Sequence, residues 1–141
     1  MKVVIDTNII FSALLKKESA IKKFILDPTN ELYTCNFLFV EIFKYRNKIE
    51  KFSELEFDDI LSAMRIILSR VHFVNEGMIP PEIFQKAHSL CFEVDEKDTP
   101  FVALSLFLDA PLMTGDKNLI KGLAAKGFDN IVTLESIFKQ H

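Results

Sequence analysis

The sequence predicts an α/β fold in which a parallel sheet is covered by helices on both faces. Short runs of apolar, often β-branched residues alternate along the chain with segments whose apolar residues recur every three or four positions, as in amphipathic helices. The predicted strands are apolar nearly throughout rather than at alternate positions. That pattern is typical of parallel strands buried on both faces.

Five short strands are expected from the apolar runs. The first is β-branched and ends where Asp6, Thr7 and Asn8 interrupt the apolar N-terminal segment. A buried charge costs several kcal/mol unless something pairs with it, so Asp6 needs a physical explanation. The predicted strands cover residues 2–6, 32–35, 71–74, 111–114 and 131–132.

Helices are predicted between the strands in the first half of the chain. Residues 9–16 form one helix, and residues 19–27 form a second that Pro28 ends. Asn36 is expected to cap a single helix that continues to about residue 50. Residues 53–56 read Ser-Glu-Leu-Glu, a capping box. The helix after it has an apolar face made of Phe57, Ile60, Leu61, Met64, Ile67 and Leu68.

Four helices are predicted in the second half of the chain. Pro80 and Pro81 begin the first of them. The second covers residues 95–108 and is apolar nearly all round, which indicates a helix buried against the sheet. Asp116 caps the third, which Gly127 ends, and the last covers residues 133–140.

Length and composition indicate one globular domain over residues 1–141, because 141 residues are enough to bury a sizeable core. The 49% hydrophobic and 26% charged fractions are those of a soluble protein. The net charge of −3 provides no general basic field for a nucleic acid, although this count omits the charge of any bound metal ion.

The remaining composition indicates a cytoplasmic protein. Cys35 and Cys91 lie in apolar surroundings and are expected to be reduced core residues. Asp6 and Asn8 exclude a secretory signal in the N-terminal segment. No apolar run reaches the roughly 18 residues that a membrane helix needs.

Acidic residues follow the predicted strands at positions that bring them toward one edge of the sheet. Asp6 ends the first strand, Asp116 follows the fourth, and Glu41 lies among apolar residues in the helix after the second. Asp95 and Asp98 begin the most buried helix and are three residues apart, so both can point the same way. Ligands of open parallel sheets bind at this carboxyl edge.

Such a group of carboxylates is unstable without compensation. At an effective dielectric near 20, two carboxylates about 5 Å apart repel each other by roughly 3 kcal/mol. Raised pKa values or a bound cation would relieve this repulsion. An all-oxygen site without His or Cys suits Mg²⁺ or Mn²⁺ rather than zinc, and these ions serve phosphoryl-transfer chemistry.

Each acid also has a purely structural explanation. Asp6, Asp98 and Asp116 could each cap a helix N-terminus, and Glu41 could pair with Lys44 or contact the nearby Tyr45. Capping and metal binding are compatible roles, and the shared edge favours the metal site. The three histidines lack metal or triad spacing, and four glycines leave little room for a phosphate-binding loop.

Four segments, in this order along the chain, resemble the PIN-domain nuclease family. They are VVIDTNII, the Glu in FVEIFKY, VDEKDTPFVALSL, and PLMTGDKNLI. The resemblance runs from residue 2 to about residue 140. Within the family, the chain is similar in particular to prokaryotic PIN proteins of the VapC type, the toxins of toxin–antitoxin pairs. One departure is Ser105, which stands where the family usually has a small apolar residue and is small enough to pack there.

The resemblance implies a PIN-like three-layer α/β/α sandwich with a central parallel sheet. It also implies a Mg²⁺- or Mn²⁺-dependent endoribonuclease that leaves 5′-phosphate and 3′-hydroxyl ends. Carried over by position, the catalytic and metal-binding acids are Asp6, Glu41, Asp98 and Asp116, with Asp95 as an auxiliary metal ligand. Asn8 and Thr114 match polar positions that support the acids, and Thr7 belongs to the same motif.

RNA is the expected substrate, with an antitoxin protein and a second copy of the chain as expected partners. Phe24, Phe39 and Phe43 lie on predicted helices, where they either pack on the sheet or form one of these interfaces. The basic residues expected to bind RNA phosphates, or else to form ordinary solvated helix faces, are Lys44, Arg46, Lys48, Lys117 and Lys121.

Two other classes of function are compatible with an α/β domain of this kind, a partner-binding module and a phosphatase or phosphotransfer protein. A PIN-fold binding module would sequester a protein partner with weak or no catalysis, but the presence of all four acids argues against a decayed site. A haloacid-dehalogenase-type phosphatase needs an Asp two residues after its nucleophile, where this chain has Asn8. A receiver domain needs residues on its third and fifth strands that have no convincing match here.

Overall fold

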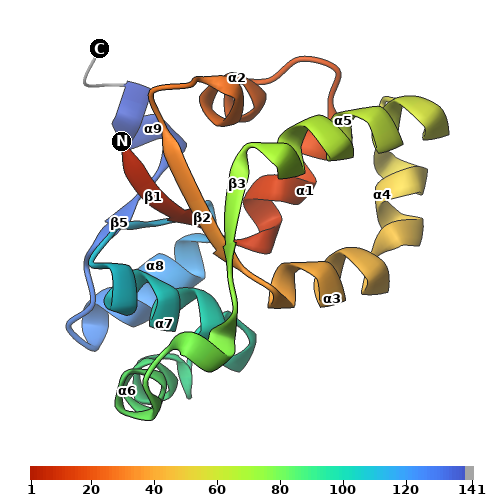
Figure 1. Cartoon of the computed structure of the whole chain (residues 1–141). Helices are drawn as coiled ribbons and strands as arrows, with labels where there is room; N and C mark the ends of the chain where they lie inside the picture. The colour runs from red at the N-terminus through yellow and green to blue at the C-terminus, as the bar shows by residue number, and fades with distance from the viewer. Residues whose placement is uncertain (139–141) are drawn as a thin grey trace.

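A five-stranded parallel sheet forms the centre of the molecule. The computed structural model of the protein describes residues 1–138. The strand order is β3-β2-β1-β4-β5, with β1 in the middle, and all four neighbouring pairs are parallel (Figure 1). The strands are β1 Lys2–Ile5, β2 Glu31–Cys35, β3 Val71–Val74, β4 Leu112–Met113 and β5 Ile131–Val132.

Helices connect the strands and cover both faces of the sheet. Two short 3₁₀ helices, η1 Glu76–Met78 and η2 Glu96–Asp98, precede α6 and α7. The α-helices are α1 Thr7–Leu15, α2 Ala20–Leu26, α3 Phe37–Lys44, α4 Arg46–Phe52, α5 Phe57–Ser69, α6 Pro81–Cys91, α7 Thr99–Leu108, α8 Lys117–Ala125 and α9 Leu134–Phe138.

Two hydrophobic cores lie on opposite faces of the sheet. Val3 and Ile5 of β1 belong to the core beneath α1–α5 and α9, whereas Val4 belongs to the core beneath α6–α8 (Figure 1). This alternation is the period of two that a strand imposes, with apolar residues on both faces. The predicted α/β class and three-layer sandwich are therefore confirmed.

The prediction of one continuous helix from Asn36 to about residue 50 was wrong. The structure has two helices, α3 and α4, separated at Tyr45, whose φ of −104° and ψ of 14° depart from helical values. Asn36 makes no side-chain capping bond. The chain therefore turns at Tyr45 and presents that side chain at the junction of two helices.

The capping box expected at residues 53–56 was also wrong. The Ser53 hydroxyl donates to the Leu14 carbonyl oxygen at 2.7 Å, and Ser53 Oγ accepts from the Leu55 N–H. The N-cap of α5 is Glu56, without a side-chain bond. A tertiary contact to α1 thus replaces the local cap. Residues 139–140 of the last predicted helix lie outside the described residues.

The helix expected over residues 95–108 begins with the 3₁₀ turn η2 and continues as α7, whose residues 101–105 are all buried. Ser105 is accommodated because its hydroxyl donates to the Ala110 carbonyl oxygen at 2.5 Å.

Cys35 and Cys91 are buried free thiols, as expected, and burial raises the pKa of Cys91 to about 11. In the described part of the chain, no helix is both long and apolar enough to span a membrane.

The three phenylalanines expected either to pack on the sheet or to form an interface differ in how exposed their side chains are. Phe24 is 6% exposed and belongs to the core, which rules out an interface role for its side chain. Phe39 is half exposed and stacks on Phe73 with ring centroids 4.6 Å apart. Phe43 is 69% exposed.

Candidate functional site

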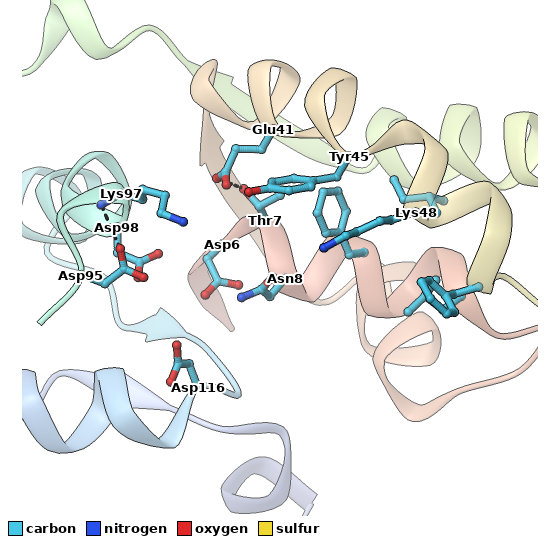
Figure 2. A pocket seen from close by; sticks show the side chains of 14 residues that line it. Asp6, Thr7, Asn8, Glu41, Tyr45, Lys48, Asp95, Lys97, Asp98 and Asp116 are labelled. Atoms are coloured by element: carbon cyan, nitrogen blue, oxygen red, sulfur yellow. Dashed lines mark hydrogen bonds between the residues drawn. The ribbon is translucent and has the colours of Figure 1, made fainter.

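A pocket of about 410 Å³ lies at the carboxyl ends of β1 and β4 (Figure 2). All five predicted acids line it, although they come from segments more than a hundred residues apart in sequence. The pocket is lined by Asp6, Thr7, Asn8, Phe11, Leu15, Glu41, Tyr45, Lys48, Ile49, Phe52, Asp95, Lys97, Asp98 and Asp116.

Asp6 joins β1 to α1 and is nearly fully buried. It is the N-cap of α1, where Oδ1 accepts from the Ile9 N–H at 3.1 Å. Its other oxygen, Oδ2, is buried without a hydrogen-bond partner among the described residues. Both the cap predicted for Asp6 and a free carboxylate oxygen are therefore present in one side chain.

Burial raises the pKa of Asp6 to about 6. The Thr114 hydroxyl and the Ile9 N–H oppose this rise by favouring the charged form, and the charges of Glu41 and Asp116 add to it. A metal-free pocket thus holds Asp6 in an unfavourable setting for a carboxylate, because its surroundings combine desolvation with like charges.

Glu41 is held in place by Thr7 rather than by Lys44. The Thr7 hydroxyl, on α1, donates to Glu41 Oε1, on α3, at 2.6 Å (Figure 2). The Thr7 side chain is buried, and the Glu41 side chain is half-buried. The structure thus assigns Thr7 a specific contact, between residues 34 positions apart, that sequence reasoning did not identify.

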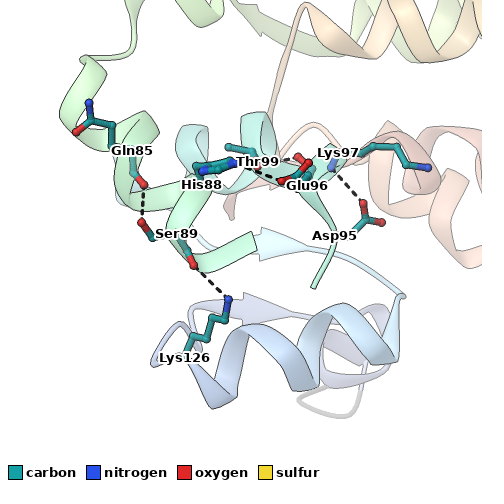
Figure 3. Close-up of polar contacts among 8 residues, drawn as sticks. All are labelled: Gln85, His88, Ser89, Asp95, Glu96, Lys97, Thr99 and Lys126. Atoms are coloured by element: carbon teal, nitrogen blue, oxygen red, sulfur yellow. Dashed lines mark hydrogen bonds and ion pairs between the residues drawn. The ribbon is translucent and has the colours of Figure 1, made fainter. Parts of the chain in front are cut away.

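Asp95 and Asp98 lie at the two ends of η2. Asp95 Oδ1 accepts from the Lys97 N–H at 3.1 Å (Figure 3). Asp98 makes no side-chain cap for α7, so the capping explanation for this residue is wrong. Burial first, and then the charges of Asp6, Asp95, Glu41 and Asp116, raise the pKa of Asp98 to about 7.

Asp116 caps α8 as predicted. Its Oδ1 accepts from the N–H groups of Asn118 at 3.0 Å and Leu119 at 3.1 Å. The Asp116 N–H in turn donates to Thr114 Oγ1 at 3.2 Å. Thr114 is buried and acts on two acids, because its hydroxyl oxygen accepts from the Asp116 N–H and its side chain lowers the pKa of Asp6.

The donor set fits a hard divalent cation. It consists of carboxylates, one of them with a buried oxygen that has no partner. In residues 1–138 the single ion pair joins His88 Nε2 to Glu96 Oε1 at 3.5 Å, outside this cluster (Figure 3). No three His, Cys, Asp or Glu side chains of the described residues are grouped closely enough to hold a metal together. Joint coordination therefore requires some of these side chains to turn.

The five basic residues predicted to bind RNA do not gather in one place. Only Lys48 lines the pocket. Lys44 is not a lining residue, but its Nζ lies 5.2 Å from the centroid of the ring of Tyr45, which does line the pocket. The Arg46 guanidinium donates to the Phe43 carbonyl oxygen at 2.6 Å. Lys117 and Lys121 are exposed on α8 and are not among the pocket residues.

Several pocket residues were missed in the sequence. Lys97 stands between the two predicted acids Asp95 and Asp98, and its position alone could have identified it. Phe11 and Leu15 repeat from Thr7 at intervals of four, which places all three on one face of α1. The other missed residues are Tyr45, Ile49 and Phe52, from the α3–α4 junction and α4.

Comparison with known proteins identifies similar sequences and folds. A family model described as PIN domain matches residues 4–136. The fold is similar to a crystal structure of VapBC2 from Rickettsia felis bound to a DNA fragment from their promoter, with a TM-score of 0.66 and 16% identity over 94% of this chain and 97% of that one. It is also similar to PAE2754 from Pyrobaculum aerophilum, with a TM-score of 0.68 and 12% identity over 99% and 88% of the two chains. No curated protein matches the sequence.

Proposed function

The chain belongs to the PIN domain family, and on that premise we propose that it is a Mg²⁺- or Mn²⁺-dependent endoribonuclease that leaves 5′-phosphate and 3′-hydroxyl ends. Members of this family are typically nucleases. The observation that carries the proposal is the buried Oδ2 of Asp6, which has no partner among the described residues and faces a pocket with four further carboxylates.

In this proposal the pocket acids hold the metal. Asp6, Glu41, Asp98 and Asp116 are the ligands, and Asp95 is an auxiliary ligand. When bound, a divalent cation would stabilise negative charge that develops on a phosphodiester and lower the pKa of a water molecule. The raised pKa values of Asp6 and Asp98 support this assignment, because a cation would relieve the repulsion that contributes to both.

The other polar residues act on the acids or on the substrate. Thr7 fixes the orientation of Glu41 through their 2.6 Å hydrogen bond. Asn8, whose side chain lies beside Asp6 in Figure 2, supports the acids or donates to a phosphate oxygen. Lys48 and Lys97 neutralise RNA phosphates next to the acids, a contact that positions the strand without reading its sequence.

We also propose that the protein is the toxin of a toxin–antitoxin pair and forms a homodimer. The apolar surface of α3 supports a protein partner, because Phe39, Val40 and Phe43 are 48%, 57% and 69% exposed. The fold similarity to VapBC2 agrees with this role. A single domain over residues 1–141 is part of the same proposal.

The proposal is tested by incubating the protein with a mixed pool of structured RNAs in Mg²⁺, Mn²⁺ or EDTA. We expect cleavage in either metal, none in EDTA, and none by Asp6→Asn. Sequencing of the ends should identify 5′-phosphates. The matched control is Asp129→Asn, an exposed acid outside the pocket, which should cleave as the wild type does. Cleavage that persists in EDTA or in Asp6→Asn would overturn the proposal.

A further inference from the structure

The pocket that contains the acids also has an apolar half. Its residues come from one face of α1 and from the α3–α4 junction and α4, next to the segments that carry Asp6 and Glu41. We refer to three of them, Phe11, Tyr45 and Phe52, as the aromatic wall. Phe11 also packs against the core on its side of the sheet, but Tyr45 and Phe52 belong to neither core cluster, so their presence in the cavity calls for a separate explanation.

From this arrangement we propose that the aromatic wall binds one unstacked base of a single-stranded RNA, next to the phosphodiester at the acids. The inference rests on the proposed nuclease function and deepens it, since it identifies which residues of this chain would hold a base beside the cleaved bond.

Tyr45 is placed for this role by the break between α3 and α4. It lies four residues after Glu41, and its N–H donates to the Glu41 carbonyl oxygen at 2.9 Å, so the acid and the ring are held on adjacent turns of backbone. Phe11 packs against the Tyr45 ring edge to face, with centroids 5.9 Å apart and planes at 81°. The ring is therefore supported by α1 while it remains part of the pocket lining.

Phe52 adds an exposed aromatic surface to the lining of the same pocket. Its side chain is 63% exposed although it is a large apolar group. Neither core cluster includes it among its members. An exposed phenylalanine that lines a cavity next to an acidic site is more useful to a ligand than to the stability of the fold.

Lysines border the pocket in a way that suits a nucleic-acid strand. Lys97 and Lys48 lie on opposite sides of Asp6 in Figure 2, so a backbone that crosses the acids would meet a cation before and after them. Lys44 and Lys48 also approach the Tyr45 ring, with Nζ atoms 5.2 and 5.5 Å from its centroid. Both lysines are exposed and have flexible stems, so they can exchange the ring for a phosphate when a base arrives.

A base fits this combination better than an apolar side chain of a protein partner. Bases stack on aromatic rings while the phosphates that flank them pair with lysines, which uses both features of the pocket. An apolar side chain would leave the lysines without anions. A double-stranded RNA keeps its bases stacked inside the helix, so only a single strand or an unpaired loop could reach the wall.

The test uses an eight-nucleotide single-stranded RNA that carries the fluorescent base 2-aminopurine at one position at a time, with Ca²⁺ in place of Mg²⁺. Stacking on an aromatic ring quenches this fluorophore. We expect quenching at one position for the wild type, and no quenching with a fully paired RNA of the same sequence. In Tyr45→Ala the quenching should be lost and the Kd should rise about tenfold. Tyr45→Phe keeps the ring and should restore both.

Two further variants control for folding and for general effects of an aromatic residue. Phe52→Ala should weaken quenching without loss of stability, because the side chain is largely exposed. Phe92→Ala removes another exposed aromatic side chain, 57% exposed and outside the pocket, and should change nothing. Unchanged quenching in both Tyr45→Ala and Phe52→Ala would overturn the inference, as would equal binding of paired RNA.

Parallel cleavage assays in Mg²⁺ separate this inference from the proposed function. Cleavage by the wild type without quenching at any position would overturn the proposed base site and support the proposed nuclease function. Position-specific quenching that depends on Tyr45, without cleavage of any RNA, would support the proposed base site and overturn the proposed nuclease function.

Discussion

Two aspartates at opposite ends of the sheet show how differently the chain treats the same side chain. Asp27 ends α2 at the amino end of β2, is exposed, and its Oδ1 accepts from the Thr29 N–H at 2.9 Å and the Thr29 hydroxyl at 2.7 Å. These bonds lower the pKa of Asp27. Asp6 begins α1 at the carboxyl end of β1, is buried, and has one oxygen without a partner and a raised pKa.

The amino end of the sheet is completed by the chain itself. The Arg70 guanidinium donates to the carbonyl oxygens of Ile25, Asp27 and Asn30 at 3.3, 3.0 and 3.4 Å, and its charge further lowers the pKa of Asp27. At the carboxyl end the described residues contain no ion pair to any pocket acid. The difference teaches that the chain pairs and bonds its polar groups at the amino end, whereas it leaves the pocket acids without an ion pair among the described residues.

The largest effect is expected from removing one charge at each end. Asp98→Asn should reduce metal-dependent RNA cleavage at least about a hundredfold, because it removes a proposed metal ligand. Asp27→Asn is the matched control and should leave cleavage unchanged. Initial rates on one cleaved RNA at saturating Mg²⁺ measure both. Equal losses in the two variants would mean that the carboxyl end has no special role.

Added metal should stabilise the acidic end selectively. At a Mg²⁺ or Mn²⁺ concentration of 100 times its Kd, the free energy of unfolding should rise by about 2.7 kcal/mol. In a domain of this size that corresponds to a Tm increase of about 5–10 °C. Thermal unfolding at pH 7.5 with and without metal tests this. The same increase in Asp6→Asn would show that the metal binds elsewhere.

The two aspartates should have opposite effects on stability as pH changes. The folded-state pKa of Asp6 is about 6, above the value of 3.8 for an ordinary Asp, so the folded metal-free protein binds more protons between these values. Its free energy of unfolding should therefore fall as pH rises from about 4 to 7, by on the order of 2 kcal/mol from Asp6.

Asp98 adds to this fall in the same direction, because its pKa is raised to about 7. Asp27, whose pKa is lowered, contributes stability above pH 3.8 that disappears as pH falls through its folded-state pKa. Urea unfolding of wild type and Asp6→Asn at several pH values measures the difference. A fall of the same size in Asp6→Asn would contradict the assignment to Asp6.

The smallest expected effect comes from the threonines that bond to carboxylates at each end. Thr7→Val keeps the shape of the side chain but removes the hydrogen bond to Glu41, and it should reduce cleavage about tenfold. Thr29→Val removes the corresponding bond to Asp27 and should leave cleavage unchanged. If Thr7→Val cleaves RNA at the wild-type rate, Glu41 does not depend on Thr7 for its orientation.

Much of this molecule was predictable from local patterns. Apolar runs identified the strands. Asp6 and Asp116 follow β1 and β4, so each lies at the carboxyl edge of the sheet and also caps the helix that comes next, α1 or α8. These features depend on neighbours in sequence, because a strand end and a helix N-terminus are local structures. Parallel strands then align their carboxyl ends, which is why separate acids could be expected in one pocket.

Only the tertiary structure decided how the pocket is built around those acids. The Thr7–Glu41 bond spans 34 residues, and the bond from Ser53 to Leu14 replaces a local cap that the sequence favours. The chain breaks its helix at Tyr45, which lines the pocket, although the residues around it read as one helix. Such features depend on contacts between distant elements, which compete with local preferences of about 1 kcal/mol and often prevail.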